Sequence, residues 1–208
     1  MTSTKACLLV ATPELLDPNF HRSVVLVLEH NDDGALGVVL NRPRLVSGGD
    51  VVPQWADRLA FPSRLHSGGP VSEDSVIGLA LGPAGGIDGL SPLLGQLGVV
   101  DLHRSPEELP DVESVRLFAG YSGWSAGQLE AELLAGGWIV VDALPEDALT
   151  SSPEELWQAV LGRQPGLLGH LAGYPADPRP NCGRRSGPHL HGRAQRPEGE
   201  PRRDRTGD

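Results

Sequence analysis

The chain has 208 residues, of which 39% are hydrophobic and 4% aromatic, and its formal net charge is −10. This length suits a single domain whose core is filled mainly by aliphatic side chains. No run of about 18 apolar residues occurs, which excludes a membrane-spanning helix, and the two cysteines, Cys7 and Cys182, are too few for a disulfide framework. Residues 1–6 lack the features of a secretion signal, so we expect a cytoplasmic protein that does not associate with membranes.

The charge is divided unevenly along the chain. Residues 182–208 hold seven arginines against four acidic residues, a balance of +3, which leaves −13 for the rest of the chain. An acidic body repels a phosphate backbone, whereas binding to duplex DNA usually requires a basic face. The composition therefore argues against specific nucleic-acid binding by the folded part.

The first half of the chain predicts a strand followed by a hairpin. Residues 6–12 are a short apolar run, typical of a buried strand, and residues 13–23 contain the helix and strand breakers of a loop. Residues 24–30 and 35–41 are two further apolar runs, separated by the turn residues Asn31-Asp32-Asp33-Gly34. Two such runs around an Asp-Gly turn predict a β-hairpin.

The second half predicts more strands and two clear helices. We expect a short helix near residues 54–59, a Gly/Pro-rich loop over residues 83–93, and strands over residues 75–81, 97–102, 115–121 and 138–142. A helix over residues 126–135 has Ser125 as its N-cap and Gln128 at the capping-box position. The last helix has Ser152 as N-cap and Pro153 in its first turn.

The apolar pattern ends after Tyr174. Residues 176–208 are rich in Pro, Gly and Arg and offer almost no apolar side chains to bury, so we expect disorder there. The chain is therefore divided into an α+β domain, residues 1–180, and a disordered tail, residues 181–208.

The segment Gly123-Trp124-Ser125-Ala126-Gly127 matches the G-x-S-x-G pattern of a nucleophile elbow, between a predicted strand and a predicted helix. Asp142 and His170 could complete a triad in the required order. Ser125 already has a structural role as helix N-cap, however, and Gly-rich segments produce this short pattern by chance. We therefore assign no catalytic residue and keep a serine hydrolase as an alternative.

Metal and cofactor motifs are weak in this sequence. Cys182, His189 and His191 lie in the predicted tail and lack a fourth ligand at usual zinc spacing. The Gly-rich stretch at residues 85–89 matches neither a dinucleotide-binding loop nor a P-loop. We therefore expect no metal site and no cofactor.

Charged side chains gather around the first two predicted strands: Asp17, Arg22, Glu29 and His30, with Glu130 on a predicted helix. Arg22 can bond a carboxylate through both arms of its guanidinium and so fix the long loop at residues 13–23 to the following strand. The alternative is a ligand-binding arginine at the mouth of a loop, because loops often carry function. The structural clamp is the favoured interpretation.

Together these segments resemble the AlgH-like (YqgE) family of bacterial proteins over roughly residues 6–175. The matching pieces, in order, are Leu9-Val10-Ala11-Thr12-Pro13, Leu16-Asp17-Pro18-Asn19-Phe20-His21-Arg22-Ser23-Val24-Val25, Glu29-His30, Gly34-Ala35-Leu36-Gly37, Asn41-Arg42-Pro43, Gly68-Gly69-Pro70-Val71, Phe118-Ala119-Gly120-Tyr121-Ser122-Gly123-Trp124, Gly127-Gln128-Leu129-Glu130-Ala131-Glu132-Leu133 and Trp138. Ala126 departs from the family pattern, which usually has a proline there.

The resemblance implies a compact α+β fold with bent mixed or antiparallel sheets and a small barrel-like region surrounded by helices. The family is largely uncharacterised, its members are often labelled transcriptional regulators, and it supplies no established catalytic residues. Our hypothesis is a non-enzymatic binding or regulatory protein that engages an unknown protein or small-molecule partner. The candidate residues are Asp17, Phe20, Arg22, Ser23, Glu29, His30, Asn41, Arg42, Tyr121, Trp124 and Gln128.

Overall fold

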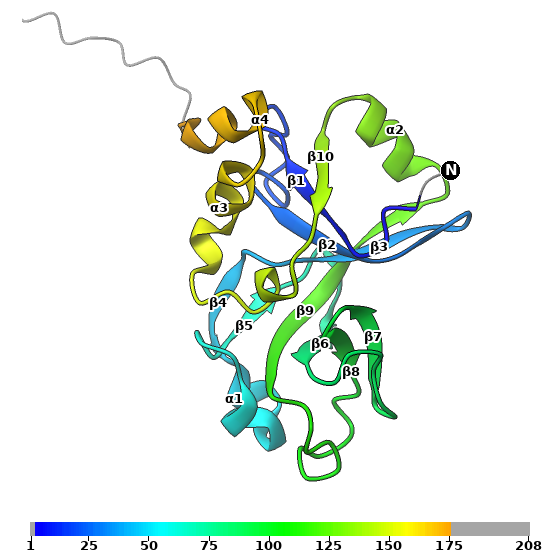
Figure 1. The fold of residues 1–208 in the computed structure, drawn as a ribbon, viewed down its shortest axis with the longest axis vertical. Helices are drawn as coiled ribbons and strands as arrows, with labels where there is room; N and C mark the ends of the chain where they lie inside the picture. Colours follow the sequence, from blue (N-terminus) through cyan, green and yellow to red (C-terminus); the bar gives the residue numbers. More distant parts are fainter. Residues whose placement is uncertain (1–2, 176–208) are drawn as a thin grey trace, which may run out of the picture. The chain divides into compact units, whose positions relative to one another are not determined.

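The structure, a computed structural model, describes residues 3–175 (Figure 1). Its strands are β1 (Cys7–Ala11), β2 (Val24–Asn31), β3 (Gly34–Val39), β4 (Pro43–Ser47), β5 (Arg64–Ser67), β6 (Val71–Leu81), β7 (Leu90–Leu94), β8 (Leu97–Val100), β9 (Ser114–Ser125) and β10 (Trp138–Asp142). Its helices are α1 (Gly48–Val51), α2 (Gln128–Leu134), α3 (Leu156–Gly162) and α4 (Leu167–His170), with 3-10 turns at Pro53–Arg58, Pro145–Asp147, Pro153–Glu155 and Leu171–Gly173. None of the helices within residues 3–175 has the length and apolar composition needed to cross a membrane.

The strands form one strongly bent sheet. Their order is β10-β1-β2-β3-β9-β6-β8-β7, and β5 pairs antiparallel with β4 and parallel with β9. The hairpin predicted over residues 24–41 is confirmed as β2 and β3, with Asn31 opposite Gly34 at the turn. The predicted fold class is also confirmed, since the structure is α+β with a mainly antiparallel sheet that curls into a half-barrel.

The first strands of the sheet are buried on both faces. Successive side chains of a strand point to opposite faces, so Leu8 and Val10 pack with Trp157 of α3, whereas Leu9 packs with Leu129 of α2. Figure 1 accordingly shows α3 and α4 on one side of β1 and β10, and α2 on the other. A strand covered on both faces requires a continuous apolar run, which explains why the sequences of β1 and β2 do not alternate.

β9 joins the two halves of the sheet. Its last four residues pair with β3, whereas its first half pairs with β6 and with β5. Between these parts Gly120 has φ of +68°, and a Cβ at this position would lie 2.7 Å from the carbonyl oxygens of Gly69 and Val71. Glycine therefore allows β9 to bend here while the beginning of β6 stays in contact with it.

Three strands, β4, β5 and β7, are absent from the sequence prediction. β7 occupies the end of the segment predicted to be a loop over residues 83–93. It contains Pro92 and lies at the edge of the sheet, where a residue without an N–H is tolerated. Short strands of four or five residues depend on their neighbours in the sheet, and their own sequences carry little signal.

Both predicted helix caps differ from expectation. α2 begins at Gln128, two residues later than predicted, and Ser125 is the last residue of β9. The Gln128 side chain accepts the Ser125 N–H at 3.1 Å, as in a capping box, but the Ser125 hydroxyl donates to that same oxygen and caps no helix amide. Ser152 makes no side-chain cap bond either, and it precedes the 3-10 turn Pro153–Glu155, which continues into α3.

A buried arginine links β9 to two distant segments. Arg116 is 1% exposed and donates to the carbonyl oxygens of Thr150 at 2.9 Å and Phe61 at 2.7 Å, and to Nε2 of His66 at 3.3 Å. The Nδ1 atom of His66 lies 3.0 Å from the carbonyl oxygen of Arg64, so Nδ1 carries the ring proton and Nε2 accepts. Burial and the Arg116 charge lower the pKa of His66 to about 4. The cation is therefore surrounded by carbonyl oxygens and a neutral imidazole.

The predicted tail lies outside the described residues, together with Cys182, His189 and His191. The proposed division at residue 180 stays a prediction. Within residues 3–175, no group of three or more His, Cys, Asp or Glu side chains is placed to hold a metal ion.

Replacing Gly120 by alanine should destabilise the protein strongly. The new Cβ would lie 2.7 Å from two carbonyl oxygens, and a left-handed backbone costs a non-glycine residue about 1 kcal/mol in addition. Gly127→Ala is the matched control, because Gly127 has φ of +74° and no atom within 4 Å of its Cβ position. In urea unfolding followed by circular dichroism, Gly120→Ala should lower the free energy of unfolding by at least about 2 kcal/mol more than Gly127→Ala does. Equal losses would contradict the close approach.

Acidification should destabilise the protein through His66. Its pKa of about 4 in the folded state lies below the ordinary value of 6.5, so the unfolded chain takes up the proton first and stability falls as the pH drops from 6.5 to 4. The full pKa difference between the unfolded and folded states corresponds to a loss of roughly 3 kcal/mol in the free energy of unfolding. NMR should show the His66 imidazole still neutral at pH 5, while urea midpoints decline across this range. An imidazole that titrates at its ordinary pKa in the folded protein would exclude this origin of the pH dependence.

Candidate functional site

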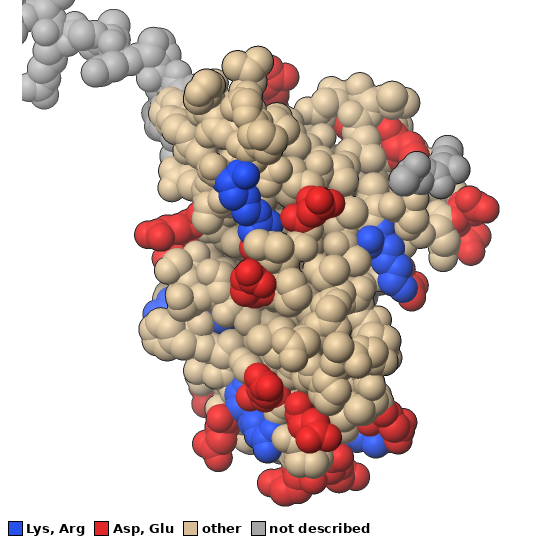
Figure 2. All heavy atoms as spheres, viewed as in Figure 1, with Lys and Arg blue, Asp and Glu red and all other residues tan. Residues whose placement is uncertain are grey.

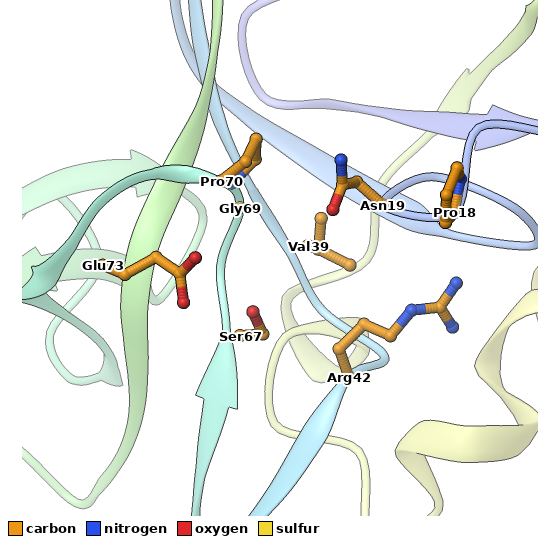
Figure 3. Close-up of a pocket in the computed structure, with 8 residues that line it drawn as sticks. All are labelled: Pro18, Asn19, Val39, Arg42, Ser67, Gly69, Pro70 and Glu73. Carbon is orange, nitrogen blue, oxygen red and sulfur yellow. The ribbon is translucent and has the colours of Figure 1, made fainter.

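A small pocket lies where the loop after β1 meets the end of β3 and the connection between β5 and β6 (Figure 3). Its volume is about 170 Å³, and it is lined by Pro18, Asn19, Val39, Arg42, Ser67, Gly69, Pro70 and Glu73. Figure 3 shows polar side chains of Asn19, Arg42, Ser67 and Glu73 arranged around Val39. We call this site the arginine pocket.

Main-chain hydrogen bonds fix the walls of the arginine pocket. The Gly68 N–H donates to the carbonyl of Ala119 at 2.8 Å, and the Gly68 carbonyl accepts the Val39 N–H at 2.8 Å. The Ser67 N–H donates to the carbonyl of Arg42, also at 2.8 Å. The pocket is thus held by the ends of β3 and β5 and by β9, a rigid scaffold of the kind that commonly positions binding residues.

Arg42 places a positive charge in the pocket wall. Its side chain is partly buried, and burial lowers the pKa of its guanidinium. Its Nη2 donates to the carbonyl oxygen of His21, but no carboxylate within residues 3–175 lies at ion-pair distance from it. Arg44 differs, because it pairs with Glu73 at 2.7 Å. The charge of Glu73 is therefore already balanced, whereas that of Arg42 is not.

The arrangement favours a small acidic group. A guanidinium binds carboxylates and phosphates through charge-assisted hydrogen bonds, and the Ser67 hydroxyl and the Asn19 amide can add further donors. Ligand pockets for drug-sized molecules usually measure about 300–1,000 Å³. A volume of about 170 Å³ instead accommodates a group the size of one side chain.

Four of the predicted site residues lie at a second hollow. Asp17, Phe20 and Gln128 line a hollow of about 460 Å³ between the loop after β1 and α2, and Trp124 stacks on Phe20 with ring centroids 6.4 Å apart. We call it the acidic hollow, because three carboxylates line it. These four candidates therefore lie at a hollow that is separate from the arginine pocket, where Arg42 lies.

Arg22 and Asn41 hold the loop at residues 13–23 in place. Arg22 does not bond the carboxylate that the sequence suggests: its Nη1 donates to the carbonyl of Tyr174 at 2.9 Å, and its guanidinium lies 4.1 Å from the ring centroid of Trp157. The Asn41 side chain accepts the Val24 N–H and donates to the Arg22 carbonyl, each at 2.9 Å. Both side chains are thus occupied by contacts within the protein.

The other candidates also lie away from the arginine pocket. His30 accepts the Thr4 N–H at Nδ1, 3.0 Å away, so its Nε2 donates to the Glu130 carboxylate at 2.8 Å. This pair ties the beginning of the chain to α2. The remaining three candidates line neither the arginine pocket nor the acidic hollow: Ser23, which is fully buried, Tyr121, which packs against the core, and Glu29, which is exposed on β2.

The residues of the alternative hydrolase triad lie on separate elements. Ser125 ends β9 and Asp142 ends β10, with β1, β2 and β3 between these two strands. His170 belongs to α4, which packs against α3. Among the residues that the structure describes, Gln128 is the hydrogen-bond partner of the Ser125 hydroxyl, whereas an activated serine bonds a base.

Sequence reasoning missed most of the arginine pocket. The available signal was the Gly68-Gly69-Pro70 segment, which served only as part of the family resemblance. Its proximity to Arg42 depends on the antiparallel pairing of β4 with β5, in which Pro43 lies opposite His66, and on the hydrogen bond from the Ser67 N–H to the Arg42 carbonyl. The pocket residues not predicted are Pro18, Asn19, Val39, Ser67, Gly69, Pro70 and Glu73.

Comparison of sequences identifies close relatives. Residues 8–168 match the AlgH-like family. A UPF0301 protein of Streptomyces coelicolor is 49% identical over 187 residues, which cover 87% of this chain and 97% of that protein. A UPF0301 protein of Mycobacteroides abscessus is 48% identical over 175 residues, covering 82% and 84% of the two chains.

Two solved structures share the fold. The crystal structure of a protein from Corynebacterium diphtheriae superposes with a TM-score of 0.78 at 34% identity, covering 84% of this chain and 93% of that one. The solution structure of the AlgH protein from Pseudomonas aeruginosa, also UPF0301, gives a TM-score of 0.61 at 31% identity, covering 83% and 94%. Because the family match spans more than half of the sequence and relatives are nearly half identical, this chain belongs to the AlgH-like family of uncharacterised UPF0301 proteins.

Proposed function

We propose that the protein is a non-enzymatic binding protein that holds an acidic group of its partner in the arginine pocket. The observation that carries this proposal is Arg42, a partly buried cation in a pocket wall with no carboxylate at ion-pair distance within residues 3–175. A cation that has lost part of its hydration is stabilised by a counter-ion that a ligand supplies.

The position of Arg42 supports specific recognition. The bond to the His21 carbonyl orients its guanidinium, which Figure 3 shows on the side of Pro18 and directed away from Ser67. Ser67 and Asn19 line the same pocket. The Ser67 N–H donates to the Arg42 carbonyl at 2.8 Å, so the backbone that carries these two side chains needs little ordering on binding. An acidic side chain, a chain terminus or a small carboxylate or phosphate would match this geometry.

The location and the regulatory role stay predictions. The family label favours a transcriptional regulator. Figure 2 shows acidic side chains spread over the drawn face with basic side chains isolated among them. This distribution favours a regulator that acts through a protein or small molecule over one that binds duplex DNA directly.

Arg42→Ala should abolish partner capture. When the immobilised protein is incubated with a lysate of the native host, the wild type should retain partners and Arg42→Ala should lose them, because the acidic group of the partner loses its counter-ion. For a charged hydrogen bond we expect the affinity to fall about tenfold or more. Arg104→Ala is the matched control, since Arg104 forms an exposed ion pair with Asp88 at 2.7 Å. Arg42→Lys, which keeps the charge but not the planar fork, should bind weakly.

Quantitative mass spectrometry of the captured proteins and metabolites, with circular dichroism to establish folding, provides the measurement. Retention of the same partners by a folded Arg42→Ala protein would remove the arginine pocket as the binding site.

Ser125 should not react with a fluorophosphonate probe. Its hydroxyl donates to Gln128 at 3.1 Å, so no base withdraws its proton and it remains a weak nucleophile. Labelling should equal that of Ser125→Ala and fall far below that of a known serine esterase under the same conditions. Labelling of the wild type that disappears in a folded Ser125→Ala variant would show that Ser125 is an activated nucleophile and would favour a hydrolase over a binding protein.

A further inference from the structure

The acidic hollow lies between the loop after β1 and α2, with the turn that joins α2 to β10 at its edge. Its volume is about 460 Å³, and it is lined by Thr12, Glu14, Leu15, Asp17, Phe20, Gln128, Glu132, Ala135, Gly136, Gly137 and Trp138. It shares with the arginine pocket only the loop after β1, whose residues Pro18 and Asn19 face that pocket. The two sites are therefore separate.

Aromatic rings form one wall of the acidic hollow. Phe20 stacks on Trp124 and meets Trp138 edge to face, with ring centroids 5.5 Å apart in the second pair. The two tryptophans also pack edge to face, with centroids 6.1 Å apart. Phe20 and Trp138 line the hollow itself, so a ligand there would meet aromatic surface.

Glu132 is held rigidly beside these rings. One carboxylate oxygen accepts both indole N–H groups, from Trp124 at 3.0 Å and from Trp138 at 2.8 Å. The other oxygen accepts the Gln128 side-chain amide at 3.0 Å. These three donors fix the position of the carboxylate without supplying a positive charge.

All the charged residues that line the hollow are acidic. Glu14 and Asp17 join Glu132 in its lining, and no lysine, arginine or histidine of residues 3–175 is among the residues that line it. None of these three carboxylates has an ion-pair partner within residues 3–175. A negative potential beside aromatic rings attracts organic cations.

We propose that the acidic hollow is a binding site for an arginine side chain presented by a partner protein. The planar guanidinium can stack on the half-buried ring of Phe20 while it bonds a rim carboxylate with both arms, a combination that the compact ammonium of lysine cannot make. The volume of about 460 Å³ exceeds one side chain, which leaves room for part of its neighbours. This inference goes beyond the arginine pocket and does not depend on it.

Exposed apolar side chains next to the lining residues support a peptide as the carrier of the arginine. The lining residue Leu15 is half-buried, and Leu16, which follows it in the loop, is 70% exposed. Such side chains can contact apolar residues that flank the arginine. The preferred segment is therefore an arginine between apolar residues.

The test is an NMR titration of the full ¹⁵N-labelled chain with the acetylated and amidated peptide Leu-Arg-Leu. The indole N–H signals of Trp124 and Trp138 should shift in a saturable manner, whereas Trp55 and Trp157, which are buried elsewhere, should remain unchanged. The peptide with citrulline in place of arginine, which has the same shape without the charge, should bind at least tenfold more weakly.

Two double variants complete the test. Glu14→Gln with Asp17→Asn should weaken binding about tenfold, because two exposed charges are removed. Glu154→Gln with Glu155→Gln removes two equally exposed charges that line a different pocket and should change the affinity less than twofold. Arg42→Ala should leave this binding unchanged, which separates it from the proposed function. Equal binding of the citrulline peptide, equal weakening by both double variants, or unmoved Trp124 and Trp138 signals would overturn the proposal.

Discussion

The close approach of the β5–β6 connection to Gly120, where β9 bends, holds the two halves of the sheet together. On one side of this residue β9 pairs with β3, and on the other with β6 and β5. The backbone of the β5–β6 connection approaches Gly120 so closely that a side chain would strike carbonyl oxygens 2.7 Å away. This contact brings Ser67 and Gly69 to the end of β3, and it thereby creates the arginine pocket from segments that are distant in the sequence.

The loop after β1 separates two sites of opposite charge. Pro18 and Asn19 face the arginine pocket, whereas Asp17 and Phe20 face the acidic hollow. Asn41 holds the end of this loop through two hydrogen bonds of 2.9 Å. A loop fixed in this way gives both sites a stable shared wall, which lowers the ordering cost of binding at either one.

Polar side chains that suggest chemistry in the sequence often serve as internal ties. His66 and Arg116 are completely or almost completely buried at 0% and 1% exposure, and His30 joins Thr4 to Glu130. Buried polar groups need hydrogen-bond partners, so a histidine or arginine in such a place is used by the fold. Arg42 stands apart because its charge has no acidic partner within the described residues while its side chain faces a pocket.

Local patterns were enough to predict the buried strands, the β2–β3 hairpin, the acidic character of residues 1–181 and the family. Continuous apolar runs and Asp-Gly turn chemistry act locally, so they can be recognised without the fold. The sequence also indicated Arg42 as a binding residue, but only as one of eleven candidates. The fold was needed to place Arg42 with Ser67 and Gly69, and to place Phe20 and Trp124 at another hollow. The antiparallel pairing of β4 with β5 and the main-chain bonds of Gly68 with Val39 and Ala119 bring the residues of the arginine pocket together. These bonds join distant segments, so no local pattern encodes them.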